Sequence, residues 1–128
     1  ETFGTIYASA NDEVNLADFS DYRRKENIIT LPEGLTESNK LKPVEFNYKH
    51  LDISNMEKED YISKGFIAHE VQEAGLGYAV FGDKDATKTD SDGNTVPKYQ
   101  QLDTKRMIPA MVKAIQELSA KVTALESK

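Results

Sequence analysis

Apolar residues recur every seven positions near the C-terminal end of the chain. Two series of three residues run in parallel, the second starting three positions after the first: Ile108, Ile115 and Val122, then Met111, Leu118 and Leu125. This spacing predicts one helix over about residues 104–127, with an a/d seam along one side. Proline is tolerated only in the first turn of a helix, and Pro109 fits that position.

The seam favours self-association, since it is narrow and runs to the end of the sequence. The alternative is an amphipathic helix that packs on its own domain. β-Branched residues at a with leucine at d favour two strands in parallel coiled coils, so the pattern does not itself specify a trimer. Three heptads are also short for an independent coiled coil, and other contacts must contribute.

Shorter elements are predicted upstream. Residues 2–8 are β-branched and aromatic, which predicts a strand. A serine followed by an acid at Ser20 predicts the start of a helix, which residues 31–34 (Leu-Pro-Glu-Gly) would end. Apolar residues alternate with polar ones over residues 44–49, which indicates a half-buried strand.

A mixed segment and a hairpin follow. Residues 61–73 combine a short strand with a helix, which glycines at 75 and 77 would end. Asp92-Gly93 lies between the apolar runs 78–81 and 96–99, and such a dipeptide predicts a β-hairpin. The polar stretch is long for a hairpin loop, so we expect its tip to project into solvent or toward another chain.

Composition narrows the class of protein. The chain has 128 residues, 38% hydrophobic and 30% charged, with a net charge of −6. This size fits one domain, with or without a tail, and a modest core that benefits from partner subunits. The acidic balance argues against binding to nucleic acid or to an anionic membrane. No apolar run approaches the roughly 20 residues of a membrane span.

The first 19 residues differ in composition from the rest. They carry a charge of −4 without any lysine or arginine, whereas the remaining 109 residues carry −2. The break falls at Ser20. Because Glu1 is not a natural start, we expect the chain to be a fragment whose first residues end a β-rich parent.

No metal or cofactor site is expected. Cysteine is absent, which excludes disulfides, thiolate metal sites and cysteine nucleophiles. His69 has no histidine three or four residues further on, so it does not form a zinc motif, and His50 has no companion. Residues 83–85 and 90–94 are similar to calcium loops but lack the EF-hand spacing. Phosphate-binding glycine loops and Gly-x-Ser-x-Gly elbows are also missing.

Ser20 and Lys25 form a candidate pair for catalysis. A neutral lysine can activate a serine nucleophile, and neighbouring cations such as Arg23 and Arg24 favour the neutral form. With eight serines and 13 lysines in the chain, about 0.8 such pairs are expected by chance, so Ser20 as a helix N-cap is the simpler interpretation. On one α-helix the two side chains would lie about 140° apart. They can meet only if Ser20 lies outside the helix, or if the lysine comes from another subunit.

Four blocks together resemble one family, at residues 20–28, 65–73, 99–103 and 109–118. The first fits the pattern Ser-Asp-x-Arg-x-Lys-x-x-Ile, and the others follow in order at suitable distances. Together they resemble the intramolecular chaperone, or chaperone-of-endosialidase, domain at the C-terminus of phage tail spikes and fibres. A related domain occurs in a membrane-tethered animal transcription factor. The resemblance covers about residues 20–127.

The resemblance implies a fold and a role. The fold would be α+β: a mostly helical homotrimer with a C-terminal coiled-coil-like helix and a protruding β-hairpin arm. Residues 1–19 would be the end of a β-rich fibre, and residues 20–128 the chaperone domain. This domain would align three copies of the upstream β structure, which the arm around Asp92 would grip, and then release itself.

The resemblance also implies site residues. The scissile bond would be Phe19–Ser20, with Ser20 as nucleophile and Lys25 as general base in a single-turnover self-cleavage. Asp21 would help to position the bond. His69 falls in a block where some relatives have a residue needed for cleavage, whereas others have glutamine there.

Other classes of function stay open. They are a trimerisation module that does not cleave, a fibre tip that stays attached and binds a receptor, and a secreted hydrolase. Expected partners are two further copies and the upstream β structure of the same chain. The acidic, cysteine-free composition suits assembly in the reducing cytoplasm of a bacterial host, with the parent fibre in the virion tail.

Overall fold

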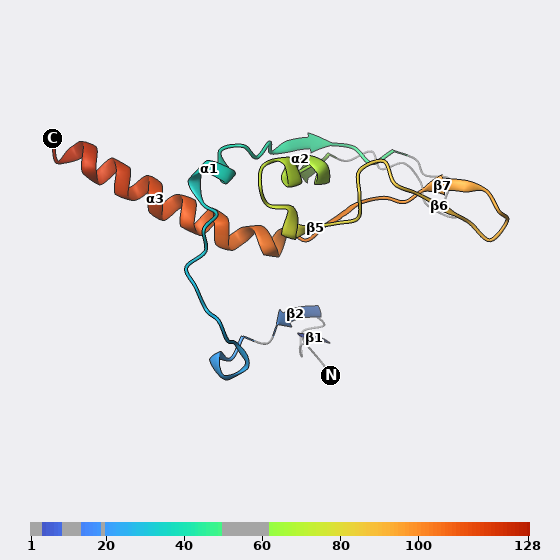
Figure 1. The fold of residues 1–128 in the computed structure, drawn as a ribbon, viewed down its shortest axis with the longest axis horizontal. Helices are drawn as coiled ribbons and strands as arrows, with labels where there is room; N and C mark the ends of the chain where they lie inside the picture. Colours follow the sequence, from blue (N-terminus) through green and yellow to red (C-terminus); the bar gives the residue numbers. More distant parts are fainter. Residues whose placement is uncertain (1–3, 9–13, 19, 50–61) are drawn as a thin grey trace. The chain divides into compact units, whose positions relative to one another are not determined.

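The chain divides into two compact units, Glu1–Thr30 and Leu31–Lys128. The computed structural model describes residues 4–8, 14–18, 20–49 and 62–128 (Figure 1). In this part of the chain, no helix combines the length and the apolar character that crossing a bilayer requires.

The first unit holds a β-hairpin and one tight turn. Strands β1 (Gly4–Ala8) and β2 (Val14–Asp18) pair antiparallel, and the ladder runs from Ala8↔Val14 to Gly4↔Asp18. The strand predicted over residues 2–8 is therefore confirmed from Gly4 onward. A 3-10 turn, η1 (Tyr22–Arg24), follows where a longer helix was predicted.

The second unit mixes short strands with helices of very different length. Helix α3 (Ile108–Glu126) has 19 residues, whereas α1 (Leu35–Ser38) has four and α2 (Ala68–Glu73) has six. The remaining elements are short: β3 (Val44–Phe46), β4 (Ser63–Gly65), η2 (Gly77–Ala79), β5 (Val80–Phe81), β6 (Thr87–Thr89), β7 (Thr95–Pro97), β8 (Gln101–Leu102) and η3 (Thr104–Met107). The α+β class is confirmed. "Mostly helical" is wrong for the described residues, because α3 is their only long helix.

Several predicted elements of this unit are confirmed. The strand expected over residues 44–49 is β3, which pairs antiparallel with β4. The strand-plus-helix segment is β4 followed by α2, and the chain leaves α2 through Gly75 at a φ of 101°. Side chains rarely adopt this backbone conformation, which explains a glycine there.

A small buried cluster holds the second unit together. Its members come from α2, η2, η3 and α3: Val71, Leu76, Ala79, Met107 and Ala110. Partly buried side chains pack around them from the flanking segments, namely Leu31, Leu41, Phe66, Val80 and Leu102. The buried centre is small for the length of the chain, as the composition predicted.

Helix α3 has two different apolar faces. The face toward its own domain consists of small residues, with Ala110 0% and Ala114 7% exposed, so that α1 can pack closely against it. The predicted seam lies elsewhere: all six of its residues, from Ile108 to Leu125, are between 41% and 68% exposed. The single chain therefore leaves these six side chains largely exposed, and α3 packs on its own domain through Ala110 and Ala114 instead.

The segment before α1 is fastened to α3. The Lys113 ammonium donates a hydrogen bond to the carbonyl oxygen of Leu31. At Gly34, which precedes α1, an added Cβ would overlap the carboxylate of Glu117. A side chain at this position would displace the flexible end of Glu117, so the beginning of the second unit lies close against its longest helix.

The predicted hairpin exists, but its strands differ from the prediction. Strand β6 pairs with β7, in register from Thr87↔Pro97 to Thr89↔Thr95, and this arm projects from the unit on the side away from the end of α3 (Figure 1). The apolar run 78–81 supplies β5, which pairs with β8 at the base of the arm. Threonine-rich strands without apolar alternation escaped the sequence analysis, because neither face of the arm is buried.

The base and the tip of the arm have separate supports. At the base, the Arg106 guanidinium lies 5.2 Å from the Phe81 ring centre and donates a hydrogen bond to the Tyr78 carbonyl. At the tip, Asp90 Oδ1 accepts hydrogen bonds from the backbone of Asp92 (2.9 Å) and Asn94 (2.8 Å). The acidic residue that suggested a calcium loop thus closes the turn.

Candidate active site

The segment from Ser20 to Asn27 does not form the α-helix that was predicted. Asp21, and not Ser20, is the N-cap of η1: its Oδ1 accepts a hydrogen bond from the backbone nitrogen of Arg23 at 2.9 Å. The turn ends at Lys25, whose backbone is extended with φ −117° and ψ 143°. Asn27 then has a φ of 54°, which is incompatible with helix. The prediction failed because no residue of η1 is buried, and helices this short depend on packing.

Because this segment forms a short turn and not an α-helix, Ser20 and Lys25 come together. With Ser20 outside the turn and Lys25 just beyond it, the Lys25 Nζ and the Ser20 Oγ are 2.6 Å apart. Both residues belong to one chain and both are exposed. The structure therefore meets the first of the two conditions under which the pair could interact: the serine lies outside any helix.

The pair has the geometry of a nucleophile and its base. A distance of 2.6 Å between the heavy atoms lies within the range over which a proton transfers directly. A neutral lysine in this position can accept the hydroxyl proton while the oxygen attacks a carbonyl carbon. Exposure leaves the site open to water, the second reactant in the hydrolysis of an ester.

Asp21 faces Arg23 and not the pair. Its Oδ1 accepts a second hydrogen bond from Arg23 Nε at 2.9 Å, and its Oδ2 accepts one from Nη2 at 2.8 Å. This contact with the guanidinium lowers the pKa of Asp21 from its ordinary value and raises that of Arg23. From the sequence, Arg23 is expected only to be a neighbouring cation of Lys25. The pattern that indicates its actual partner is an acid at the N-cap with arginine two residues later.

The other predicted site residues do not lie beside Ser20 and Lys25 in the described part of the first unit. Phe19 lies outside the described residues, as does His50. His69 lies on α2 of the second unit, where it is half-buried. The pKa of Asp85 is lowered mainly by its hydrogen bond to Lys84, and His69 adds a small effect of the same sign. The part of His69 in cleavage stays a prediction.

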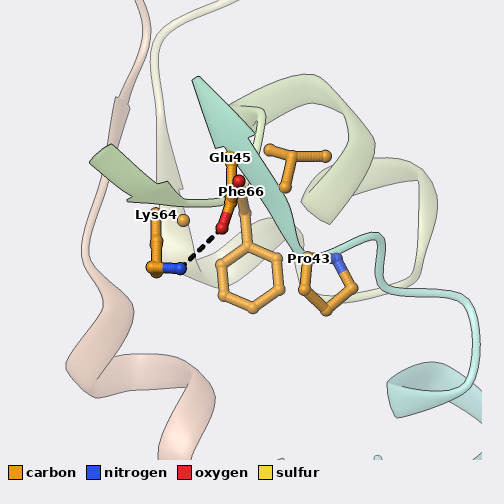
Figure 2. A pocket seen from close by; sticks show the side chains of 6 residues that line it. Pro43, Glu45, Lys64 and Phe66 are labelled. Atoms are coloured by element: carbon orange, nitrogen blue, oxygen red, sulfur yellow. Dashed lines mark hydrogen bonds and ion pairs between the residues drawn. The ribbon is translucent and has the colours of Figure 1, made fainter. Parts of the chain in front are cut away.

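A hollow beside β3 and β4 is a second place where a ligand could lie. Its volume is about 410 Å³, and Figure 2 shows Lys64 and Glu45 pointing toward each other, with the rings of Phe66 and Pro43 among the lining. The ion pair measures 2.6 Å and is exposed. No serine, threonine or histidine lines the hollow, so it has no candidate nucleophile.

Among the described residues, no group of three histidine, aspartate or glutamate side chains could hold a metal ion. Two acids of the arm have partners in the protein: Asp90 accepts hydrogen bonds from the turn backbone, and Asp85 pairs with Lys84 at 2.6 Å.

Comparison with protein families gives a match that begins within the candidate site. Residues 20–81 match the family model described as chaperone of endosialidase, whose name also classes it as a peptidase family. The match begins at Ser20 and includes Lys25, His69 and both strands that line the hollow. No curated protein matches the chain.

Proposed function

Residues 20–81 belong to the chaperone of endosialidase family, the C-terminal chaperone domains of phage tail fibres, and on this premise we propose that the chain registers and then releases an upstream fibre. An intramolecular chaperone role follows from the family. The finer proposal has three parts: the domain trimerises, it aligns three copies of the preceding β structure, and it cleaves itself off at Phe19–Ser20. The observation that carries it is the 2.6 Å contact between Ser20 and Lys25.

Trimerisation is supported by the exposed seam of α3. Large apolar side chains at 108, 111, 115, 118, 122 and 125 face solvent in the single chain, and no residue after Ala114 is buried. Contiguous exposed apolar surface of this kind is typical of an interface between proteins. We propose that the seam packs against the same seam of two further copies.

Alignment of the upstream β segments is proposed to follow from holding their C-terminal ends together. Repetitive β structure has a weakly specified register, because a shifted pairing can satisfy the same hydrogen bonds. When three C-terminal ends are held together, pairing of the preceding strands becomes intramolecular, at roughly millimolar effective concentration. This raises the rate of long-range β pairing and shortens the time over which unpaired edges can aggregate. The arm of β6 and β7 is proposed to hold the upstream strands meanwhile, in the cytoplasm of the bacterial host.

Release is proposed to proceed through an ester. Ser20 Oγ attacks the carbonyl carbon of Phe19, and Lys25 takes the hydroxyl proton. The bond from that carbon to the Ser20 nitrogen breaks, and the nitrogen receives the proton from Lys25. Water then hydrolyses the ester, which leaves a carboxylate on Phe19 and a free amine on Ser20. Each chain reacts once, and the released fibre persists because the unit that directed its assembly is gone.

The test compares cleavage in variants of the full-length chain. Ser20→Ala and Lys25→Ala should each reduce cleavage by at least about 10³-fold, since each removes half of a unit that acts together. Mass spectrometry after denaturation should find a new N-terminus at Ser20 in the unmodified chain and in neither of these two variants. Ser127→Ala and Lys128→Ala, at the end of α3, are the matched controls and should cleave normally. If the unmodified chain forms trimers but stays intact, the domain is a trimerisation module without cleavage. Full cleavage of both active-site variants would disprove the pair.

A further inference from the structure

Arg23 and Asp21 bind each other through three hydrogen bonds within the site. Asp21 Oδ1 accepts from the backbone nitrogen and from Nε of Arg23, each at 2.9 Å, and Oδ2 accepts from Nη2 at 2.8 Å. Such paired contacts between guanidinium and carboxylate fix orientation as well as distance. The pKa of Asp21 falls and that of Arg23 rises, so both groups are charged at neutral pH.

These contacts span the turn that joins the two halves of the pair. Asp21 directly follows Ser20, and Arg23 lies two residues before Lys25. Backbone hydrogen bonds from Arg24 to Asp21 and from Lys25 to Tyr22, both 3.1 Å, form the turn itself. Every residue from 20 to 30 is exposed, so packing does not hold the turn in place.

We propose that Arg23 is a positioning residue for self-cleavage, in that its guanidinium locks the Asp21 carboxylate and so keeps the turn that presents Lys25 to Ser20. This inference rests on the proposed function. An exposed ion pair of this kind contributes little to global stability. Its effect is on geometry, because misplacement of reacting groups by about 1 Å can cost about 100-fold in rate.

A different role for Arg23 would be its charge alone. A cation near Lys25 favours the neutral amine that accepts the serine proton. In that case Arg23→Lys, which keeps the charge, would cleave normally, and only a variant that removes the charge, such as Arg23→Gln, would be slowed. The positioning role predicts that Arg23→Lys is slowed as well, because lysine cannot make the paired contact.

The experiment measures the first-order rate of cleavage in the full-length chain from pH 6 to pH 9. We expect Arg23→Lys and Asp21→Asn each to be slowed about tenfold at every pH, which is the usual scale for losing one orienting charged contact. The double variant should be no slower than the slower single variant, because both changes remove the same contact. Lys42→Gln, which breaks the ion pair with Glu70, is the control and should keep the normal rate.

Further measurements separate the positioning role from unfolding and from failure of the proposed function. The denaturation midpoint and the oligomeric state of Arg23→Lys should equal those of the unmodified chain, which separates positioning from unfolding. A normal rate in Arg23→Lys or additive single effects would each overturn the proposal. If Ser20→Ala blocks cleavage while Arg23→Lys does not slow it, only the positioning role fails. If Ser20→Ala cleaves normally, the proposed function fails and the positioning role with it.

Discussion

The Lys25 amine lies 2.6 Å from the Ser20 hydroxyl oxygen, five residues away in the same chain, across a single 3-10 turn. An α-helix would have pointed the two side chains apart. The contact exists because Asp21 caps the turn and because the chain is extended again at Lys25. One chain therefore supplies both groups of the proposed dyad.

The first prediction is that the dyad does not combine across chains. Co-expression of Ser20→Ala with Lys25→Ala should give trimers in which neither chain is cut, since neither contains both groups. Denaturing gels of the purified trimers measure this directly. Cleavage of the Lys25→Ala chain in mixed trimers would show that a neighbour's lysine acts on its serine.

A charge placed in the seam should prevent association without unfolding the domain. Ile115 is 68% exposed in the single chain, so Ile115→Glu leaves the buried cluster intact. In an oligomer the carboxylate would be desolvated at a cost of several kcal/mol, and we expect association to weaken at least about 100-fold. Analytical ultracentrifugation measures the change. Gln116→Glu adds the same charge to the neighbouring exposed position and should leave association unaffected.

A substitution on the buried face of α3, opposite the seam, should lower the free energy of unfolding of the domain. Ala110 is fully buried, and Ala110→Leu would force a larger side chain into the packed cluster. Overpacking of this kind typically costs about 1–3 kcal/mol in the free energy of unfolding. Chemical denaturation of the Ile115→Glu background avoids the contribution of association. Ala120→Leu, at an exposed position away from the seam, is the control, and an equal loss there would contradict the assignment of the two faces.

Acid should weaken the start of α1 through Glu37. The backbone N–H of Gly34 donates to Glu37 Oε1 at 2.8 Å, and this is the main cause that lowers the pKa of Glu37 below its ordinary 4.5. A lowered folded-state pKa means that the stabilisation is complete above the unfolded value and is lost as pH falls through the folded one. Glu37→Gln should therefore lose less stability than the unmodified domain below pH 4.5, as denaturation midpoints at several pH values would show. Glu126→Gln is the control carboxylate, and an equal effect there would contradict this role.

The arm should be dispensable for folding of the domain and necessary for its role. None of the described residues from Gly82 to Gln100 is buried. Replacing Thr87–Pro97 by a two-residue turn should therefore change the denaturation midpoint little. The yield of protease-resistant trimeric fibre should fall several-fold, because the upstream strands lose their support. A normal yield would remove the arm from the proposal.

Apolar periodicity and glycine positions located several elements, although the single chain leaves the repeat of α3 exposed. The seven-residue repeat together with Pro109 located α3, and Gly75 marked the end of α2. The arm's strands were misplaced because Thr87-Lys88-Thr89 buries neither face, and so carries no alternation. The apolar run 78–81 was taken for an arm strand, although it pairs with Gln101–Leu102 at the base.

For the candidate site, the sequence indicated the residues but not the contact between them. The residue types of Ser20 and Lys25 suggested the pair, and the family resemblance gave it weight, since their spacing alone is expected by chance. The contact between them could not be predicted, because it depends on where the turn stops. The end of the turn depends on Asn27, which has a positive φ, and on η1, in which no residue is buried. Arg23 was overlooked as a partner of Asp21 for the same reason: the pairing is a property of the 3-10 turn.

The last rung of the β1–β2 ladder joins Gly4 to Asp18, one residue before the proposed scissile bond. A cut after Phe19 would leave every pair of that ladder on the same side of the break. The new carboxyl terminus would thus lie a single residue after β2. It would leave almost no unpaired chain at which a host protease could cleave or unfolding could start. Cleavage at this bond would therefore end the released product almost directly after its last paired strand residue.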